Sequence, residues 1–121
     1  MVPPMGDDVP ERLRTICLAL PEATEQLTWG DTVTFRVRGR IFVMHSVRER
    51  GATISCKAPP GIQEMLVGSD PEQFFVPPYV GQHGWIGVRL DARVDWEEVA
   101  DLVAESYRMT APKRLARLLG G

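Results

Sequence analysis

The alternation of apolar and polar residues is clearest over residues 33–57, where it predicts three consecutive strands. Apolar residues recur at every second position over 33–38, which is the period of a strand with one buried face. Gly-containing turns near residues 38–40 and 50–51 connect this strand to two more, the last of them at 52–56. Because tight turns connect consecutive strands, these residues predict an antiparallel sheet.

The same alternation predicts which side chains of the sheet are buried. Phe42 and Met44 are expected to join Phe35 and Val37 on the core face, whether the loop of the first hairpin falls at 38–39 or at 39–40. The outer face is then expected to carry arginines together with three further residues, Ile41, Val43 and His45. A face that is part apolar and part basic is unusual for a solvated sheet, so we expect it to be partly covered.

Apolar residues at helical spacing predict four helices around this sheet. The helices are expected over residues 8–20, 59–68, 95–108 and 110–119, and the first begins with a capping box from Asp8 to Glu11. The residues expected to be buried in the second and fourth helices are Ile62, Met65, Leu66, Leu115, Leu118 and Leu119. Residues 21–32 predict a connection and residues 85–90 a further strand, with or without a short extra strand near residue 75.

The order of these elements predicts an α+β fold of two layers, an antiparallel sheet with helices packed on one side. At 121 residues the chain is long enough for one core and too short for two ordinary ones. Residues 1–121 are therefore expected to form a single domain, with a flexible segment at 1–7.

The two cysteines and the N-terminal residues predict a cytoplasmic protein. Cys17 falls on the apolar stripe of a predicted helix and Cys56 lies inside a predicted strand, so both are expected to be buried thiols. The N-terminal residues show neither the basic nor the apolar region of a secretory signal. Free thiols without a signal favour a reducing compartment, and no apolar run is long enough to cross a membrane.

Positive charge is segregated along the chain. The net charge of −2 argues against a dedicated polyanion binder. Residues 33–60 nevertheless carry a net charge of +5 and residues 106–121 a net charge of +4, so the remaining residues carry −11. Such segregation can give a mildly acidic protein one basic face.

Several segments in a fixed order resemble a known family. They are Leu20-Pro21-Glu22-Ala23-Thr24-Glu25, Trp29-Gly30, residues 34–42, Ser55-Cys56-Lys57, residues 79–85 and residues 106–113. Together they are similar to the MmcQ/YjbR-like family of small bacterial proteins over roughly residues 10–118. The resemblance implies a compact α+β fold, related in architecture to the CyaY-like fold and to type III secretion chaperones, and members are commonly labelled DNA-binding. The 76–84 segment departs from the pattern of many relatives.

The cations near the predicted turns are candidates for contact with nucleic acid. Arginine suits this role because its planar guanidinium donates two parallel hydrogen bonds to phosphate oxygens. The candidate residues are Arg36, Arg38, Arg40, Arg48, Arg50, Lys57, Lys113, Arg114 and Arg117. Consecutive turns lie at opposite ends of a sheet, which disfavours one clamp and favours contact along the face through Arg36, Arg38 and Lys57. Alternatively, the turn arginines simply keep the sheet edges soluble.

The remaining candidates are weaker. Tyr79, His83 and Trp85 lie in a Pro- and Gly-rich loop that could hold a small ligand or stack on a base. Neither His45 nor His83 has a partner at metal-ligand spacing, and no base for a catalytic cysteine stands near Cys56. We therefore expect a binding protein and not an enzyme, without metal or other cofactor.

Three hypotheses for its ligand follow. The first is nucleic acid bound with little sequence specificity. The second is a protein partner or a second copy of the chain, as in a chaperone-like module, and the third is a small molecule at the 77–85 loop. No membrane contact is expected, because the terminal helix has an apolar side of only three leucines.

Overall fold

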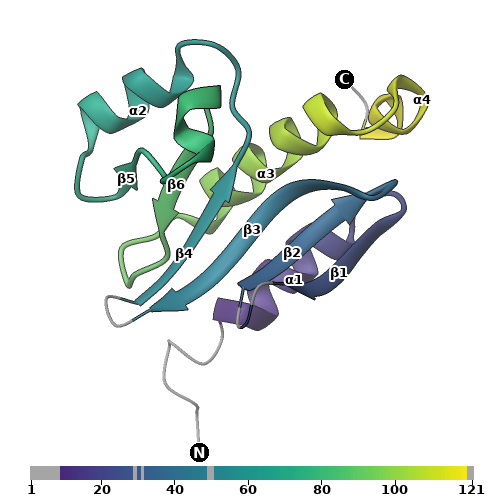
Figure 1. Ribbon diagram of the computed structural model, residues 1–121, viewed down its shortest axis with the longest axis horizontal. Coiled ribbons are helices and arrows are strands. Elements are labelled where there is room, and N and C mark those ends of the chain that lie inside the picture. The colour runs from purple at the N-terminus through teal and green to yellow at the C-terminus, as the bar shows by residue number, and fades with distance from the viewer. Residues whose placement is uncertain (1–8, 29, 31, 49–50, 120–121) are drawn as a thin grey trace, which may run out of the picture.

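The fold is a twisted six-stranded antiparallel sheet with helices against one face. The computed structural model describes residues 9–119 apart from 29, 31, 49 and 50, so the expected flexible segment at 1–7 and the cap at Asp8 lie outside the described residues. The elements in chain order are α1 (Val9–Leu18), β1 (Ala23–Thr28), β2 (Thr32–Val37), β3 (Arg40–Arg48), β4 (Gly51–Cys56), α2 (Ile62–Ser69), β5 (Phe74–Phe75), the 3₁₀ turn η2 (Val80–His83), β6 (Ile86–Arg89), α3 (Trp96–Thr110), α4 (Lys113–Ala116) and the 3₁₀ turn η3 (Arg117–Leu119). The strand order is β1-β2-β3-β4-β6-β5 (Figure 1).

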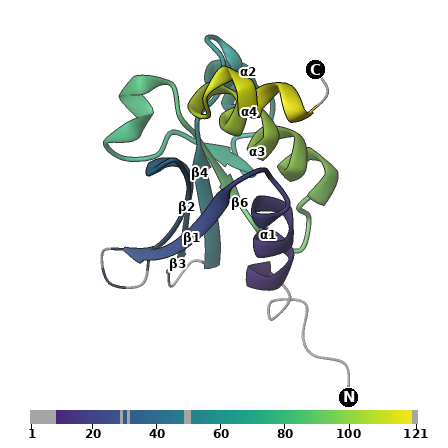
Figure 2. The same ribbon diagram turned by 90° about the vertical axis from the view of Figure 1, so that its right-hand side faces the viewer.

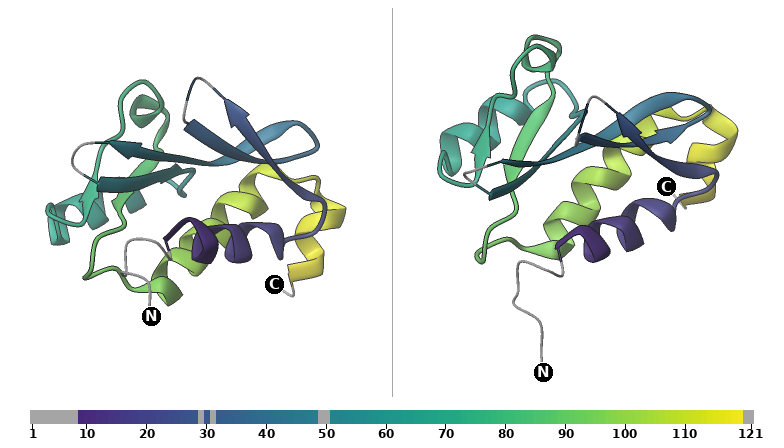
Figure 3. Two further views of the ribbon diagram at one scale, coloured as in Figure 1. Left: turned by 90° about the horizontal axis from the view of Figure 1, so that it is seen from below. Right: turned by 60° about the horizontal axis from the view of Figure 1, so that its bottom comes forward.

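The sheet has one covered face and one open face. Helices α1, α3 and α4 lie on the same side of the sheet, and the segment that contains η2 rises on the other side (Figure 3). The core between the layers is built from fully buried side chains of α1, α3 and the central strands: Leu13, Cys17, Phe35, Val37, Ile54, Ile86, Val99, Val103 and Tyr107. These observations confirm the α+β class, the two layers and the short strand near residue 75.

Strand β1 was expected to be part of a connection. Its six residues, Ala-Thr-Glu-Gln-Leu-Thr, are mostly polar and give no apolar alternation. They nevertheless pair with β2 along its whole length, from Ala23 opposite Val37 to Thr28 opposite Thr32. Backbone hydrogen bonds form this edge strand, and its side chains contribute little to the apolar core.

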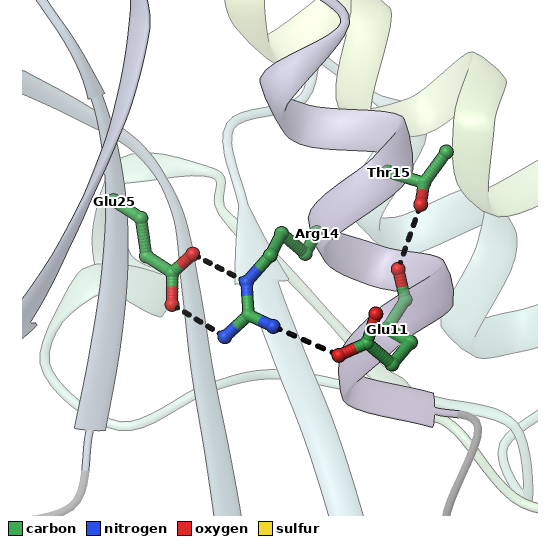
Figure 4. Close-up of polar contacts among 4 residues, drawn as sticks. All are labelled: Glu11, Arg14, Thr15 and Glu25. Carbon is green, nitrogen blue, oxygen red and sulfur yellow. Dashed lines mark hydrogen bonds and ion pairs between the residues drawn. The ribbon is translucent and has the colours of Figure 1, made fainter.

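An ion pair attaches this polar edge strand to the helical layer. Glu25 lies opposite Phe35 and therefore faces the helices. Its carboxylate accepts two hydrogen bonds from the Arg14 guanidinium of α1, from Nε at 2.7 Å and from a terminal nitrogen at 2.9 Å (Figure 4). Arg14 also donates to Glu11 at 3.1 Å. Burial of α1 against the sheet thus combines an apolar stripe with one bidentate contact at its edge.

The β2–β3 hairpin has a two-residue loop at 38–39. Val37 lies opposite Arg40, and both loop residues have positive φ, 53° for Arg38 and 80° for Gly39. Positive φ at both central positions is the type I′ turn, whose twist matches that of the flanking strands. Of the two placements left open by the sequence, the structure adopts the first.

A β-bulge in β3 overturns the expected faces of that strand. Phe35 lies opposite Val43 but Arg36 lies opposite Ile41, so Phe42 is an extra residue without a partner. Phe42 and Val43 are both fully buried, and His45 is 5% exposed. The prediction that Val43 and His45 face outward was wrong, and so was the core position of Met44, which lies opposite Thr34 on the open face.

Ser106 of α3 holds the bulge. Its hydroxyl donates to the carbonyl oxygen of Phe42 at 2.6 Å and accepts from the backbone N–H of Lys57 at 2.9 Å. The ring of Tyr107, the next residue, lies edge-on to the Phe42 ring with centroids 5.4 Å apart. The carbonyl oxygen of Phe42, at the bulge, and the N–H of Lys57, just after β4, are therefore both hydrogen-bonded to one buried hydroxyl.

Two helices differ in detail from the expectation. In α2 the buried residue is Gln63, while Met65 is 57% exposed. In the terminal segment Leu115 is buried but Leu118 is 67% exposed, because the chain changes from α4 to η3 at Arg117. Helix α3 matches its prediction, with the Asp95 carboxylate accepting from the backbone N–H groups of its first turn.

The Ser106→Ala substitution should destabilise the fold. It removes the hydroxyl that bonds to Phe42 and Lys57, and leaving such groups unpaired in the interior costs about 1–3 kcal/mol. Urea unfolding measures the change, with the exposed Ser69 of α2 as the control site (Ser69→Ala). Equal stabilities of the two variants would contradict the role of the Ser106 hydroxyl.

His45 should make stability depend on pH. Burial lowers its pKa below the usual 6.5, although a hydrogen bond to the Thr53 carbonyl and the nearby Glu25 act in the opposite direction. Well above pH 6.5 the imidazole is neutral in both states. As the pH falls below this value the unfolded chain takes up a proton first, so the free energy of unfolding decreases until the folded pKa is passed. Urea unfolding across this window should give a flatter profile for His45→Gln than for the wild type, and identical profiles would refute the assignment.

Candidate nucleic-acid interface

Cations from two distant parts of the sequence gather at one end of the sheet. The β2–β3 hairpin supplies Arg36, Arg38 and Arg40, and the α3–α4 junction is followed directly by Lys113 and Arg114. The hairpin and α4 lie at the same end of the molecule, which faces the viewer in Figure 2. We call these five residues the basic end.

A shallow cavity confirms that the two segments meet. Its volume is about 470 Å³, and its walls come from the hairpin on one side and from the α3–α4 junction on the other. The residues that line it are Arg38, Arg40, Met109, Thr110, Ala111 and Pro112. Two guanidinium-bearing residues therefore border a concave surface large enough for a phosphate group.

Arg38 has a counter-ion within the basic end. Its guanidinium donates to the Glu22 carboxylate from Nε at 2.6 Å and from a second nitrogen at 3.1 Å. The hydrogen bond from Arg38 lowers the pKa of Glu22, and the charge of Arg114 lowers it further. Both Arg38 and Glu22 have positive φ, which for Arg38 is the conformation that the type I′ turn requires.

The other cations of the basic end differ from Arg38 in their surroundings. Among residues 9–119, as far as the structure describes them, no carboxylate lies within 4.0 Å of Arg36, Arg40, Lys113 or Arg114. Arg36 donates instead to the Thr34 hydroxyl at 3.1 Å and to the carbonyl oxygen of Gly39 at 3.4 Å. Five cations and one carboxylate leave the basic end with a net charge of +4.

The remaining candidate cations are not part of the basic end. Lys57 follows the last residue of β4, and its backbone is joined through Ser106 to Phe42, two residues from Arg40. Arg117 begins η3, beyond α4. Arg48 lies opposite Gly51 at the far end of β3, and Arg50 lies outside the described residues. The expectation that the two hairpin turns lie at opposite ends is confirmed.

The three aromatic residues of the 77–85 loop do not share one surface. Tyr79 is 89% exposed and His83 is exposed, but Trp85 is buried at 8% exposure.

The burial of Val43 and His45 likewise removes the mixed apolar face that suggested a protein partner.

The sequence analysis did not identify two residues of the candidate interface, Glu22 and Arg89. Glu22 lies in a connection, as expected, but its ion pair with Arg38 was not foreseen. Arg89 lies on the open face of β6, with its guanidinium 4.8 Å from the centroid of the Phe75 ring. Alternation with the buried Val88 could have placed Arg89 on that face, whereas no local pattern pairs Glu22 with Arg38.

Metal binding, membrane insertion and cysteine catalysis were also considered for the part of the chain that the structure describes. No three His, Cys, Asp or Glu side chains there come together as a metal site, and none of its helices is long and apolar enough to cross a membrane. Both cysteines are buried, and burial raises the pKa of Cys56 to about 12 and raises that of Cys17 as well. A thiol with a raised pKa is a poor nucleophile.

Comparison with known proteins gives a family and a solved relative. The family model described as YjbR matches residues 18–109. The crystal structure of Deinococcus radiodurans protein DR2400, which contains a DUF419 domain, superposes with a TM-score of 0.75 at 25% sequence identity, covering 83% of this chain and 76% of that one. No curated protein matches this chain.

Both thiols should be unreactive in the folded protein. A disulfide-based thiol reagent at about pH 8 should label neither cysteine until a denaturant is added, because the reactive thiolate is scarce and both sulfurs are buried. Absorbance during labelling measures the rate. Rapid labelling of either residue in the native protein would contradict its burial.

Proposed function

The chain belongs to the YjbR family, and we propose that its basic end binds the phosphate backbone of nucleic acid with little sequence specificity. The observation that carries the proposal is the position of five cations at one end of the sheet, on the hairpin and on α4, where Glu22 pairs with Arg38 alone. The rest of the chain is acidic enough to bring the net charge to −2. A protein of this overall charge attracts a polyanion through a local patch, and repels it elsewhere.

The kinds of cation at this end suit phosphate. Arg40 and Arg114 are exposed, and their guanidinium groups can each donate two parallel hydrogen bonds to phosphate oxygens. Lys113 adds a mobile point charge beside them. Arg38 is held by Glu22, so it can bind phosphate only by exchanging one anion for another. Three cations are therefore directly available, and two more follow if Arg36 and Arg38 exchange their present partners.

Sequence specificity is expected to be slight. Phosphate contacts fix the position of a protein on nucleic acid but carry no sequence information, which is read from base edges. Base edges in a duplex are reached by a helix or a β-ribbon that enters the major groove. The terminal helix α4 has only four residues, too few to form such a reading element, and it begins at the basic end itself.

The proposal predicts a steep salt dependence. If about four or five phosphates are neutralised, the logarithm of the affinity for a short duplex should fall with the logarithm of salt concentration at a slope of about −4. Fluorescence anisotropy with a labelled duplex measures the slope. The Arg40→Ala and Lys113→Ala variants should each weaken binding and make the slope shallower by about 1.

A matched control is available on the opposite side of the molecule. Arg93 lies between β6 and α3, so Arg93→Ala changes the net charge equally without touching the basic end. It should leave the slope unchanged. Absence of binding to duplex and single strands at low salt would disprove the proposed function, and equal effects of Arg40→Ala and Arg93→Ala would show that the basic end is not the site.

A further inference from the structure

Tyr79 is presented to solvent by a strained turn. Its backbone has φ 66° and ψ −61°, and the N–H of Val80 donates to the carbonyl oxygen of Pro78 at 2.7 Å. This hydrogen bond between residues two apart closes a γ-turn with positive φ, which is rare and strained for a residue with a side chain. The side chain is 89% exposed. Strain without burial means that the local fold does not use the Tyr79 ring for its own packing.

Contacts with Gln63 and Val76 fix the backbone of the loop around Tyr79. The buried amide of Gln63 in α2 donates to the carbonyl oxygens of Gly81 at 2.8 Å and of Trp85 at 2.6 Å. The Val76 side chain fills the space that a side chain on Gly81 would need. Because the backbone is fixed in this way, a partner that stacks on Tyr79 does not have to order the loop backbone, which reduces the entropy cost of binding.

None of the strand residues that the structure describes on the open face of the sheet, next to this loop, is acidic. Strand register places hydroxyls, amides, cations and a few apolar side chains on that face, and the only carboxylate in β1, Glu25, faces the helices. The register places on this face Thr24, Gln26, Thr28, Thr32, Thr34, Arg36, Ile41, Met44, Ser46, Thr53, Ser55, Phe75, Gly87 and Arg89, of which Thr32 and Thr34 are buried. The segment that contains η2 rises on the same side (Figure 3).

Aromatic and basic groups lie close together there. The Phe75 ring covers Gly87, and the Arg89 guanidinium lies 4.8 Å from the centroid of that ring. The backbone at Gly84, at the end of the loop that carries Tyr79, adjoins the carbonyl oxygen of Ala58, the residue after Lys57. From β4 toward β2 the face continues to Arg36, which belongs to the basic end.

We propose that the open face binds a single-stranded nucleic acid, with Tyr79 as a platform on which one base stacks. This inference rests on the proposed function and names its ligand. Phosphates would contact Arg36, Lys57 and Arg89, and a base would lie on the Tyr79 ring. A cationic surface bordered by aromatic rings is the arrangement by which proteins hold single strands without reading their sequence.

A single strand fits this surface better than a duplex does. Bases in a duplex are stacked on one another, so their faces are not accessible to an exposed tyrosine, whereas an unpaired strand offers them. A duplex would therefore use the basic end alone. Between Glu72 and Arg89 the chain has no charged residue apart from His83 when protonated, so nothing on the loop repels a phosphate backbone that approaches Tyr79.

The test compares two ligands and three variants. Anisotropy titrations of full-length protein with labelled oligothymidylate should show a loss of about 5- to 100-fold in affinity for Tyr79→Ala, and near-wild-type affinity for Tyr79→Phe, which keeps the ring. The slope against salt should stay the same for both variants, because stacking releases no counterions. Duplex affinity should not change. Val47→Ala, at the far end of β3 and 54% exposed, is the control for loss of an exposed apolar side chain.

The outcomes separate this inference from the proposed function. Wild-type protein that binds neither ligand disproves both. Salt-dependent duplex binding with no effect of Tyr79→Ala on oligothymidylate leaves the proposed function and overturns the stacking role, which would turn attention to a protein partner for the loop. Equal losses for duplex and single strand in Tyr79→Ala also overturn it, because a stacking platform acts on unpaired bases only.

Discussion

The β-bulge in β3 is the constraint on which the rest of the structure depends. One extra residue, Phe42, lets two consecutive side chains enter the core, and the strand continues beyond it with opposite alternation. The hydroxyl of Ser106 compensates for the interrupted ladder, and the Tyr107 ring packs on Phe42. Because α3 is fixed to the sheet at this point, its C-terminal end and the α4 that follows lie beside the β2–β3 hairpin, which is what creates the basic end.

The arrangement also explains how an acidic protein can carry a basic surface. Away from the basic end, Arg14 is paired with Glu25 and Arg108 with Glu105, on or near the helical layer. These pairs neutralise both arginines. At the basic end, as far as the chain is described, Arg38 alone is paired with a carboxylate. Its partner Glu22 follows Pro21, whose carbonyl oxygen accepts a hydrogen bond from Tyr107 at 2.6 Å. Tyr107, which packs on Phe42 at the bulge, thus also helps to position Glu22, the counter-ion of Arg38. Electrostatic attraction is consequently concentrated where hairpin and terminal helix meet.

The sequence predicted the fold class and most elements because their apolar periodicity is strong. It did not predict β1, since an edge strand formed by backbone hydrogen bonds can be polar throughout, and it placed Val43 and His45 on the wrong face, since alternation cannot reveal an inserted residue. The site was predicted in part: the hairpin and terminal cations were named, but the pairing of Glu22 with Arg38 and the position of Arg89 beside Phe75 depend on strand pairing that no local pattern encodes.

The central claim is that nucleic acid contacts one continuous surface, from the hairpin and the α3–α4 junction across the open face of the sheet to Tyr79. Backbone amide NMR spectra recorded during titration with oligothymidylate test it most directly. The account predicts that the amides that shift belong to residues 36–40, 57–58, 79–80, 89, 110–111 and 113–114, while those of α1 remain in place. Shifts concentrated in α1 and the start of α3, or spread evenly over the molecule, would contradict it.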